Sequence, residues 1–352
     1  MSERYQGGYI TATVVNPDGS IQDSSTATGV WTLPEQFTFN KADLWPKINA
    51  RGLVMGGNTE SPFTYYDIID FITIASTANA TDFGNLSVAG RYNHAVASET
   101  RAVNIGGITV TDGEAVNVIE YVTIASTGNM TDFGDTSEGA RSQGAGGVGS
   151  KTRGVYAGGR TEPAGTTDEI GYITIASTGD STDFGNLQAA TTNGGGGGCS
   201  PTRGVFMFAD VSPTGRIDYI TIASTGNATD FGDLSNNHGE GAYGCSSNLR
   251  AINRQFSVLE YITIASTGNM TDFGDPLGGA SSSTSRLRWG AGFSNNTLGI
   301  FAGGEGQGNT SGYKDQVEYV TIATTGNTAD YSDLTQARGY GAGTSQGHGG
   351  HQ

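Results

Sequence analysis

The sequence has little cysteine, few basic residues and no long apolar run, and each shortage narrows the possible functions. Two cysteines in 352 residues are not a disulfide framework. With 18 basic against 34 acidic residues, the net charge of -16 would repel a phosphate backbone, so we expect no nucleic-acid partner. The absence of an apolar run of about 18 residues predicts no membrane span. Residues 1–15 lack the basic and apolar regions of a signal peptide.

Proline is also scarce, at 8 residues, whereas glycine is abundant at 57. The glycines follow no Gly-X-Y period, which excludes a collagen helix. Apolar residues make up only 35% of the chain. That content suits many small sheets that pack through small side chains.

One phrase recurs six times along the chain. It begins at Phe71, Tyr121, Tyr172, Tyr219, Tyr261 and Tyr319, and its fourth copy reads YITIASTGNATDFGDL. The spacings of 50, 51, 47, 42 and 58 residues between these starts fit a four-stranded propeller blade. The repeat is therefore the main evidence for the fold.

Each repeat can be divided into four strands. The phrase itself supplies a β-branched strand, a Gly-Asn turn and a short closing strand containing TDFG. Upstream lies a strand that often starts with Arg and ends in paired glycines, as in RGVYAGG from Arg153. A stretch of small residues such as TNGGGGGCS precedes it, and we assign it to the innermost strand, where backbones crowd at the axis. A low-complexity linker is the competing interpretation of these stretches.

Counting strands predicts a closed ring. The first repeat begins at Arg51 without a Gly-rich strand before it, and the chain ends with an unpaired one, GYGAGTSQG from Gly339. Six of each strand type result if the C-terminal strand pairs beside residues 51–57. We therefore predict an all-β six-bladed β-propeller over residues 49–352, closed by its last strand, after an N-terminal segment of residues 1–48.

The strand order resembles the kelch repeat, most clearly at Gly158-Gly159 and Glu120-Tyr121. It departs from kelch in the fourth strand, where the usual Trp is replaced by Phe133, Phe184, Phe231, Phe273 or Tyr331. The repeated phrase is also similar to kelch-like repeats in virion proteins of tailed phages, particularly marine and cyanobacterial ones. Residues 28–46 resemble the lead-in segment of such proteins.

This resemblance implies a virion component of the phage tail, such as a tail fibre, made in the host cytoplasm. Its partners would be other virion proteins, further copies of the chain as a homo-oligomer, and a host-surface glycan or protein. We expect it to mediate host attachment. The alternative is a purely architectural tail or capsid component whose loops contact other subunits.

The segment of residues 1–48 lies outside the repeat. Its large apolar side chains are Trp31, Leu33, Phe37 and Trp45. The segment is too short for a core of its own, so these groups must be buried elsewhere. We expect them to anchor the chain to a virion partner, and packing against the propeller is the alternative.

The loops between the second and third strands differ in every repeat, whereas the loop between the third and fourth strands is nearly invariant. Variable loops on a rigid scaffold are the usual place for recognition. The expected ligand-binding residues are Tyr65, Tyr66, Tyr313 and Lys314, because tyrosine rings can stack on sugar faces. These tyrosines could instead pack on neighbouring blades.

Other residues that can carry chemistry point to no active site. Repeated pairs such as Asp230 and Asp233 could hold Ca²⁺, but an aspartate beside a turn is more simply a backbone cap. His348 and His351 could bind a metal, although a mobile tail is the simpler expectation. We predict no metal and no cofactor. An enzyme resembling galactose oxidase would need grouped copper ligands, which the sequence does not group, so we predict no enzyme.

The cysteines are expected to be structural. Cys199 and Cys245 each stand in a Gly-Cys-Ser context, 46 residues apart, which is close to the repeat period. We therefore expect them to occupy the same place in neighbouring blades, as small buried residues.

Overall fold

The chain divides into two units, residues 1–49 and 50–352. The computed structural model describes residues 14–15, 21–22, 50–60, 62–110, 114–137, 139–142, 146–161, 165–191, 195–208, 215–235, 241–277, 287–306 and 312–350, and the backbone of residue 351. In the first unit, β1 (Val14–Val15) pairs antiparallel with β2 (Ile21–Gln22). The proposed anchors Trp31, Leu33, Phe37 and Trp45 lie outside the described residues.

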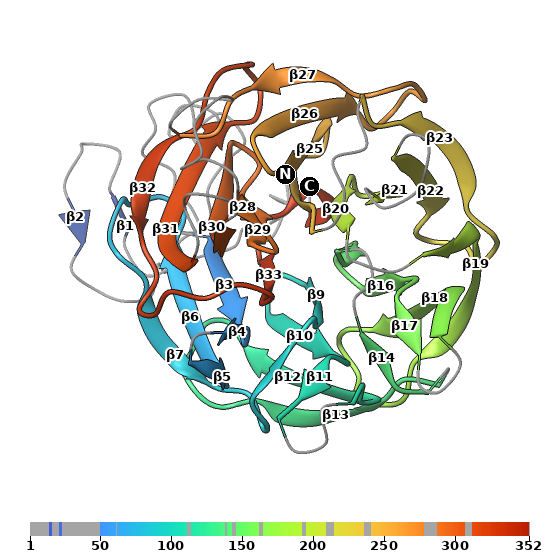
Figure 1. The fold of residues 1–352 in the computed structure, drawn as a ribbon, viewed down its shortest axis with the longest axis horizontal. Helices are drawn as coiled ribbons and strands as arrows, with labels where there is room; N and C mark the ends of the chain where they lie inside the picture. Colours follow the sequence, from blue (N-terminus) through green and yellow to red (C-terminus); the bar gives the residue numbers. More distant parts are fainter. Residues whose placement is uncertain are drawn as a thin grey trace, which may run out of the picture. The chain divides into compact units, whose positions relative to one another are not determined.

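The second unit is an all-β six-bladed β-propeller (Figure 1). Blades 1 to 3, each from the innermost strand outward, are β33 (Ala342–Ser345), β3 (Arg51–Met55), β6 (Ile68–Thr73), β7 (Thr81–Asn85); β9 (His94–Ala97), β10 (Arg101–Ile105), β12 (Val118–Thr123), β13 (Thr131–Asp135); and β15 (Val148–Gly149), β16 (Arg153–Ala157), β18 (Gly165–Thr174), β19 (Thr182–Thr191).

Blades 4 to 6 follow the same order. They are β20 (Gly195–Cys199), β21 (Arg203–Phe208), β22 (Arg216–Thr221), β23 (Thr229–Asp233); β24 (Tyr243–Ser246), β25 (Arg250–Gln255), β26 (Val258–Thr263), β27 (Thr271–Gly274); and β29 (Ala291–Ser294), β30 (Leu298–Gly306), β31 (Gly312–Thr321), β32 (Ala329–Asp333). No helix within the described ranges is long and apolar enough to cross a membrane.

The last strand closes the ring, as predicted. β33 pairs antiparallel with β3, with Leu53 opposite Thr344. The continuous ladder begins at Ala342, and Gly339 forms an isolated antiparallel bridge with Asn58. Between them the ladder is interrupted at Tyr340, which has a φ of +63°. The first and last parts of the propeller sequence therefore share blade 1, where the blue and red strands meet in Figure 1.

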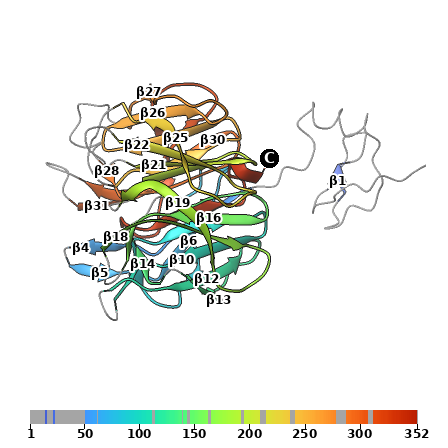
Figure 2. The same ribbon diagram turned by 90° about the vertical axis from the view of Figure 1, so that its right-hand side faces the viewer.

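The propeller has two faces that differ in their loops. We call the side that carries the second-to-third and blade-to-blade loops the loop face, and the opposite side the tail face. Short strands in the loops of the loop face pair with one another. β4 (Asn58–Glu60) pairs with β5 (Phe63–Tyr65) within one loop, whereas β8 (Gly90–Arg91) with β11 (Ile108–Thr109) and β14 (Arg141–Ser142) with β17 (Arg160–Thr161) pair between neighbouring loops. In Figure 2, β4 and β5 lie toward one face and the C-terminus lies at the other.

The hydrophobic core consists of clusters between neighbouring blades rather than one central mass. In the cluster between blades 1 and 2, Leu53 and Phe83 pack with Ala102 and Val122. The described residues form six such clusters, one at each blade interface. Each blade is thus stabilised by burying both of its faces against its neighbours.

The invariant third-to-fourth loop joins each blade to the one before it. The Asn or Asp of this loop accepts a hydrogen bond from the main chain of the preceding fourth strand. The six bonds run from Asn85, Asp135, Asn186, Asp233, Asp275 and Asp333 to the side chains of Asn129, Asp180, Asn227, Asn269, Asn327 and Asn79, at 3.0–3.2 Å. A Cβ on Gly84 would lie 2.2 Å from the carbonyl oxygen of Gly128 in this loop, so the contact requires glycine.

The repeated arginine makes a second inter-blade bond. Arg51, Arg101, Arg153, Arg203 and Arg250 each donate to a main-chain carbonyl at the end of the next blade's third strand. Each guanidinium also lies over an aromatic ring of its own blade, as Arg153 does 4.3 Å from the centre of the Tyr172 ring. In blade 6 the position is Leu298, so the interface that closes the ring lacks this bond.

A buried carboxylate makes a third inter-blade bond. In five blades it accepts the main-chain N–H that follows the preceding blade's fourth strand. The donors Ser87, Gln188, Ser235, Leu277 and Thr335 bond to Glu120, Asp218, Glu260, Glu318 and Asp70 at 3.0–3.4 Å. Blade 3 has Gly171 there, and Ser137 donates instead to the hydroxyl of Ser181, which also accepts from Tyr156. These bonds explain why the repeat keeps an acidic residue before the aromatic one.

Candidate functional site

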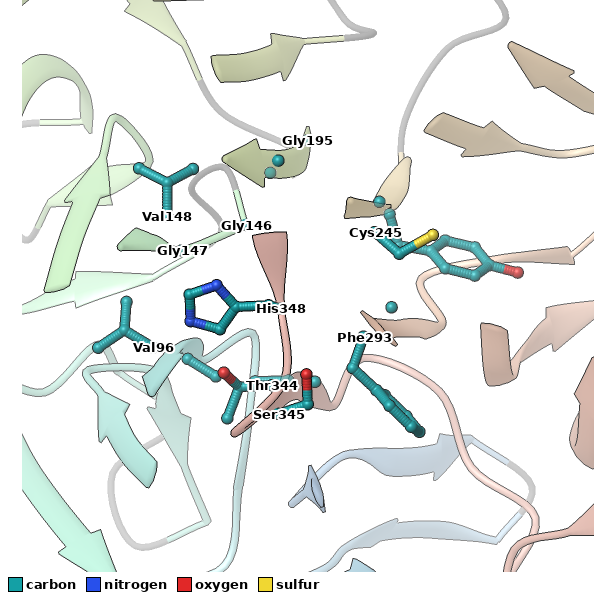
Figure 3. Close-up of a pocket in the computed structure, with 18 of the residues that line it drawn as sticks. Val96, Gly146, Gly147, Val148, Gly195, Cys245, Phe293, Thr344, Ser345 and His348 are labelled. Carbon is teal, nitrogen blue, oxygen red and sulfur yellow. The ribbon is translucent and has the colours of Figure 1, made fainter. Parts of the chain in front are cut away.

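The innermost strands enclose an axial channel with a cavity of about 110 Å³ (Figure 3). Its wall is largely glycine backbone because the strands approach closely, as where a Cβ on Gly197 would lie 2.5 Å from the carbonyl oxygen of Gly146. This crowding confirms the assignment of the Gly-rich stretches to the innermost strands. Val96, Val148 and Thr344 contribute side chains to the wall.

His348 closes the channel at the tail face. Its Nε2 lies 3.1 Å from the carbonyl oxygen of Ala97, and its Nδ1 lies 3.1 Å from the main-chain nitrogen of Gly350 and 3.3 Å from Sγ of Cys199. A neutral imidazole that donates from Nε2 and accepts at Nδ1 satisfies all three contacts. Burial lowers the pKa of His348 to about 4, against the opposing effect of the bond to Ala97.

The expectation of a mobile C-terminal tail is therefore wrong. Residues Gly349–His351 form a short 3-10 turn, η2, and Gly350 packs against the backbone of Gly149. The tail docks because the ends of the innermost strands expose carbonyls that its imidazole and backbone can reach. The side chain of His351 lies outside the described residues, so a metal held by both histidines stays a sequence-based alternative. Within the described ranges, no three His, Cys, Asp or Glu side chains group as metal ligands.

The rest of the tail-face opening is ringed by serine hydroxyls. Ser345 donates to the carbonyl of Ser294, which donates to that of Ser246, which in turn donates to that of Cys199. The main-chain N–H groups of Ser294, Ser246 and Cys199 donate back to the next hydroxyl. Serines and tail together close this end of the channel.

The two cysteines do not occupy equivalent places, contrary to the expectation. Cys199 lies opposite Gly204, whereas Cys245 lies opposite Ile252, one residue out of step. The reason is the spacing: Arg203 and Arg250 stand 47 residues apart, and the cysteines 46. Because strand side chains alternate, Cys199 contacts His348 while Cys245 packs between blades 5 and 6. Both thiols are buried and free, and burial raises the pKa of each.

At the loop face, the channel mouth is built from three aromatic residues with left-handed backbones. The φ angles of Tyr92, Trp289 and Tyr340 are +60°, +57° and +63°. Their main chains form a chain of hydrogen bonds, from Tyr92 N to Tyr340 O at 2.8 Å, from Tyr340 N to Trp289 O at 2.6 Å, and from Trp289 N to Gly241 O at 2.8 Å. Gly241 has the equivalent position in blade 5 with a φ of +81°, which a glycine adopts without strain.

The three rings pack on one another and on the variable loops. Trp289 and Tyr340 stack with centroids 5.3 Å apart, and Tyr92 meets both edge-to-face at 5.0 and 4.9 Å. Tyr313 lies 6.2 Å from Tyr340, and the guanidinium of Arg91 lies 4.9–5.6 Å from the ring centres of Tyr65, Tyr92 and Tyr340. We call Tyr65, Tyr92, Trp289, Tyr313 and Tyr340 the aromatic rim.

A charged network adjoins the aromatic rim. The hydroxyl of Tyr340 donates to Oε2 of Glu305 at 2.5 Å, and Nε of Arg288 donates to the same oxygen at 2.9 Å. Burial and then the bond to Glu305 raise the pKa of Tyr340, which keeps its phenol protonated as a donor. Tyr65, Tyr92 and Tyr313 of the rim are partly exposed, whereas Trp289 and Tyr340 are buried beneath them at 7% and 5% exposure. The rim thus combines partly exposed tyrosines with fixed hydrogen-bonding groups.

The predicted ligand residues fall into two groups. Tyr65 and Tyr313 both join the aromatic rim. They are distant in sequence, because Tyr65 lies in a loop of blade 1 and Tyr313 in a loop of blade 6, and ring closure makes these blades neighbours. Tyr66 acts through its backbone, bonding to Gly57 and Gly90, and the carbonyl of Lys314 accepts from the main chain of Arg338. Both of these side chains are half-buried. Whether any of the four binds a ligand stays a prediction.

Sequence reasoning missed Arg91, Tyr92, Trp289 and Tyr340. A signal was present, since an aromatic residue stands two positions before the innermost strand in Tyr92-Asn93, Trp289-Gly290 and Tyr340-Gly341. The expectation of small residues near the axis obscured it.

Fold and site together define a six-bladed β-propeller whose channel is closed at the tail face and bears an aromatic rim at the loop face. The fold distantly resembles the solved structure of YjhT, a kelch-repeat protein, with a TM-score of 0.53 over 74% of this chain and 88% of that one. The sequence identity is 9%, so the likeness establishes the fold alone. No protein-family model and no curated protein matches the sequence.

Proposed function

We propose that the propeller is a non-enzymatic binding module whose aromatic rim recognises a carbohydrate. The observation that carries the proposal is the strained backbone of Tyr92, Trp289 and Tyr340. A bulky residue in the left-handed region costs about 1–2 kcal/mol. Gly241 shows that the same turn forms with glycine, so three aromatic side chains are kept at the channel mouth at a cost to stability.

The chemistry of the rim suits a sugar. Ring faces of Tyr65, Tyr92 and Tyr313 are partly exposed and can pack against the C–H faces of a pyranose. Arg91, Arg288 and Glu305 stand beside them and can bond to hydroxyl groups. The tyrosines lose little rotamer freedom on binding, which favours them as contact residues.

The proposed setting is host-surface attachment by a phage virion, with residues 1–48 as the anchor to other virion proteins. The support for this setting is the similarity of the repeated phrase to phage virion repeats. It is also compatible with topology, because the propeller begins at Ala50 on the tail face, beside Gly347. Further copies of the chain would complete a tail assembly.

A purely architectural role is the second candidate. Its support is apolar exposure on the loop face, where Phe63, Val88 and Val110 are 53%, 42% and 55% exposed. Apolar groups gathered on one face are typical of a contact with another protein.

Binding of the full chain to a glycan array tests the carbohydrate proposal. We expect selective binding that Tyr313→Ala and Tyr65→Ala each weaken by about tenfold or more, the effect of one contact residue. Tyr261→Ala is the matched control, since Tyr261 is equally half-buried but lies under Arg250 in blade 5. Absence of any glycan ligand, or equal binding by all three variants, would overturn the proposal and favour the architectural role.

A further inference from the structure

The inter-blade carboxylates differ in whether a cation accompanies them. Three of the five inter-blade carboxylates form ion pairs, in Arg338–Asp70, Arg216–Asp218 and Arg254–Glu318, with N–O distances of 2.9–3.1 Å. Glu120 and Glu260 form none with the described residues. Glu120 is only 4% exposed, yet its bonds are to neutral groups, the N–H of Ser87 and Nδ2 of Asn104. No described Lys, Arg or His forms an ion pair with it.

Blade 1 obtains its cation from a position at which blade 2 has a glycine. The carbonyl of Arg338 accepts from Gly304 at 2.9 Å just before the innermost strand of blade 1, and its side chain enters to meet Asp70. The carbonyl of Gly90 accepts the equivalent bond from Gly57 at 2.8 Å before the innermost strand of blade 2. Gly90 therefore stands where Arg338 stands, one blade along, and has no side chain to offer Glu120.

A cavity of about 190 Å³ takes the place of the absent side chain. Glu120, Asn93, Asn104 and Gly90 line it, and it reaches the loop face at Val88 and Thr109. Oδ1 of Asn93 is buried and accepts no hydrogen bond from any described residue. The cavity thus contains a buried carboxylate and a second acceptor with free capacity.

We propose that this cavity between blades 1 and 2, which we call the Glu120 pocket, binds the guanidinium or primary ammonium group of a ligand. Glu120 supplies the anionic partner, and Oδ1 of Asn93 accepts a second N–H. Three other interfaces show that this fold can satisfy such a carboxylate with a guanidinium. Burial raises the pKa of Glu120, as expected for an acid whose counterion is missing. The site is separate from carbohydrate recognition by the rim.

Calorimetry with the full chain at 0.15 M salt tests the Glu120 pocket. The probes are agmatine, N-acetyl-arginine amide and N-acetyl-citrulline amide, which has the shape of arginine without the charge. We expect at least one cationic probe to bind at least about tenfold tighter than citrulline. Tight binding of agmatine alone would indicate a small free amine as the natural ligand. Tight binding of the arginine amide would indicate an arginine side chain of a peptide. Equal binding of the neutral and cationic probes would overturn the proposal.

Two variants place the binding. Gly90→Arg should fill the pocket with its own guanidinium, abolish probe binding and raise the thermal midpoint, and its backbone has no positive φ to oppose the change. Glu120→Gln removes the charge with little change of shape and should weaken binding by about tenfold or more.

The matched control is Glu260→Gln, which removes the other buried inter-blade carboxylate without an ion pair, in blade 5, and should bind like the unmodified chain. If Glu120→Gln binds as well as the control, the cation is held elsewhere on this acidic surface and the assignment fails. Glycan binding measured on the same variants separates this result from the fate of the rim proposal.

Discussion

Removal of the Arg338 side chain should weaken the propeller at the interface where the ring closes. Its guanidinium is 1% exposed and donates to Asp70 and to the carbonyl of Gly56, both at 2.9 Å, and to the carbonyl of Val54 at 3.2 Å. Asp70 is fully buried. The substitution Arg338→Met keeps the aliphatic stem and leaves this carboxylate without its cation.

The expected loss is about 3–5 kcal/mol, the range for breaking a buried ion pair from one side. That is a large part of the about 5–15 kcal/mol by which domains are usually stable. At this interface Leu298 stands where the other blades have an inter-blade arginine, and the hydroxyl of Tyr331 donates to the carbonyls of Thr73 and Ser76 instead. Lys151–Glu99 is the control pair, because its side chains are 56% and 51% exposed and its loss should cost at most about 1 kcal/mol.

Urea unfolding followed by tryptophan fluorescence and by circular dichroism measures both losses. Adding Asp70→Asn to Arg338→Met should recover part of the stability, because the double variant no longer buries a lone charge. The reasoning fails if Arg338→Met is no more destabilised than Lys151→Met. It also fails if the double variant loses the sum of the two single losses.

Three further outcomes are expected from thermal or urea unfolding. Leu298→Arg should raise the free energy of unfolding by about 1 kcal/mol, because it restores the inter-blade hydrogen bond at blade 6. Arg153→Leu should lower the free energy of unfolding, because it removes the same bond at blade 3. A loss of stability in both variants would contradict the assigned role of the arginine. Burial raises the pKa of Glu260 to about 6 from 4.5, so ionisation costs stability as pH rises through that window. Glu260→Gln should therefore raise the free energy of unfolding by about 2 kcal/mol at pH 7.5 and leave it unchanged at pH 4. An equal change at both pH values would contradict the raised pKa of Glu260. The pKa of His348 is lowered to about 4 from 6.5, so stability should fall by about 3 kcal/mol as pH drops through that range. His348→Gln should remove this part of the slope, and an unchanged slope would place the titration elsewhere.

The sequence predicted the blades well because its repeat contains all the local determinants of a strand. β-branched runs, Gly-Asn turns and paired glycines each act within a few residues, so periodicity alone located them. Ring closure could be predicted as well. The first repeat lacks an innermost strand and the C-terminus has an innermost strand without a blade, so pairing the two is the arrangement that completes six blades. The interruption of the closing pair between Gly339 and Ala342 was missed because it depends on the left-handed Tyr340.

The site was less predictable because it depends on residues distant in sequence. Tyr65 and Tyr313 were found through loop variability, but Tyr92 and Tyr340 were not, since a left-handed conformation is not expected of a bulky side chain. His348 was missed for a related reason. A tail of glycine and histidine indicates mobility until the carbonyl of Ala97 and the thiol of Cys199 are seen in reach.

Structural and binding positions of the repeat can be distinguished by whether the residue at that position is the same in every blade. Constant positions, such as the loop Asn and the strand Arg, bond one blade to the next, so their repetition reflects one interface built many times. A binding site for one ligand needs the opposite, a place that differs from its equivalents. Gly90 beside Glu120, where blade 1 has Arg338, is such a place on the loop face, and so is the side of the channel mouth that carries Tyr92, Trp289 and Tyr340 where blade 5 has Gly241. Departures from the internal repeat therefore indicate the candidate sites more directly than the repeat itself.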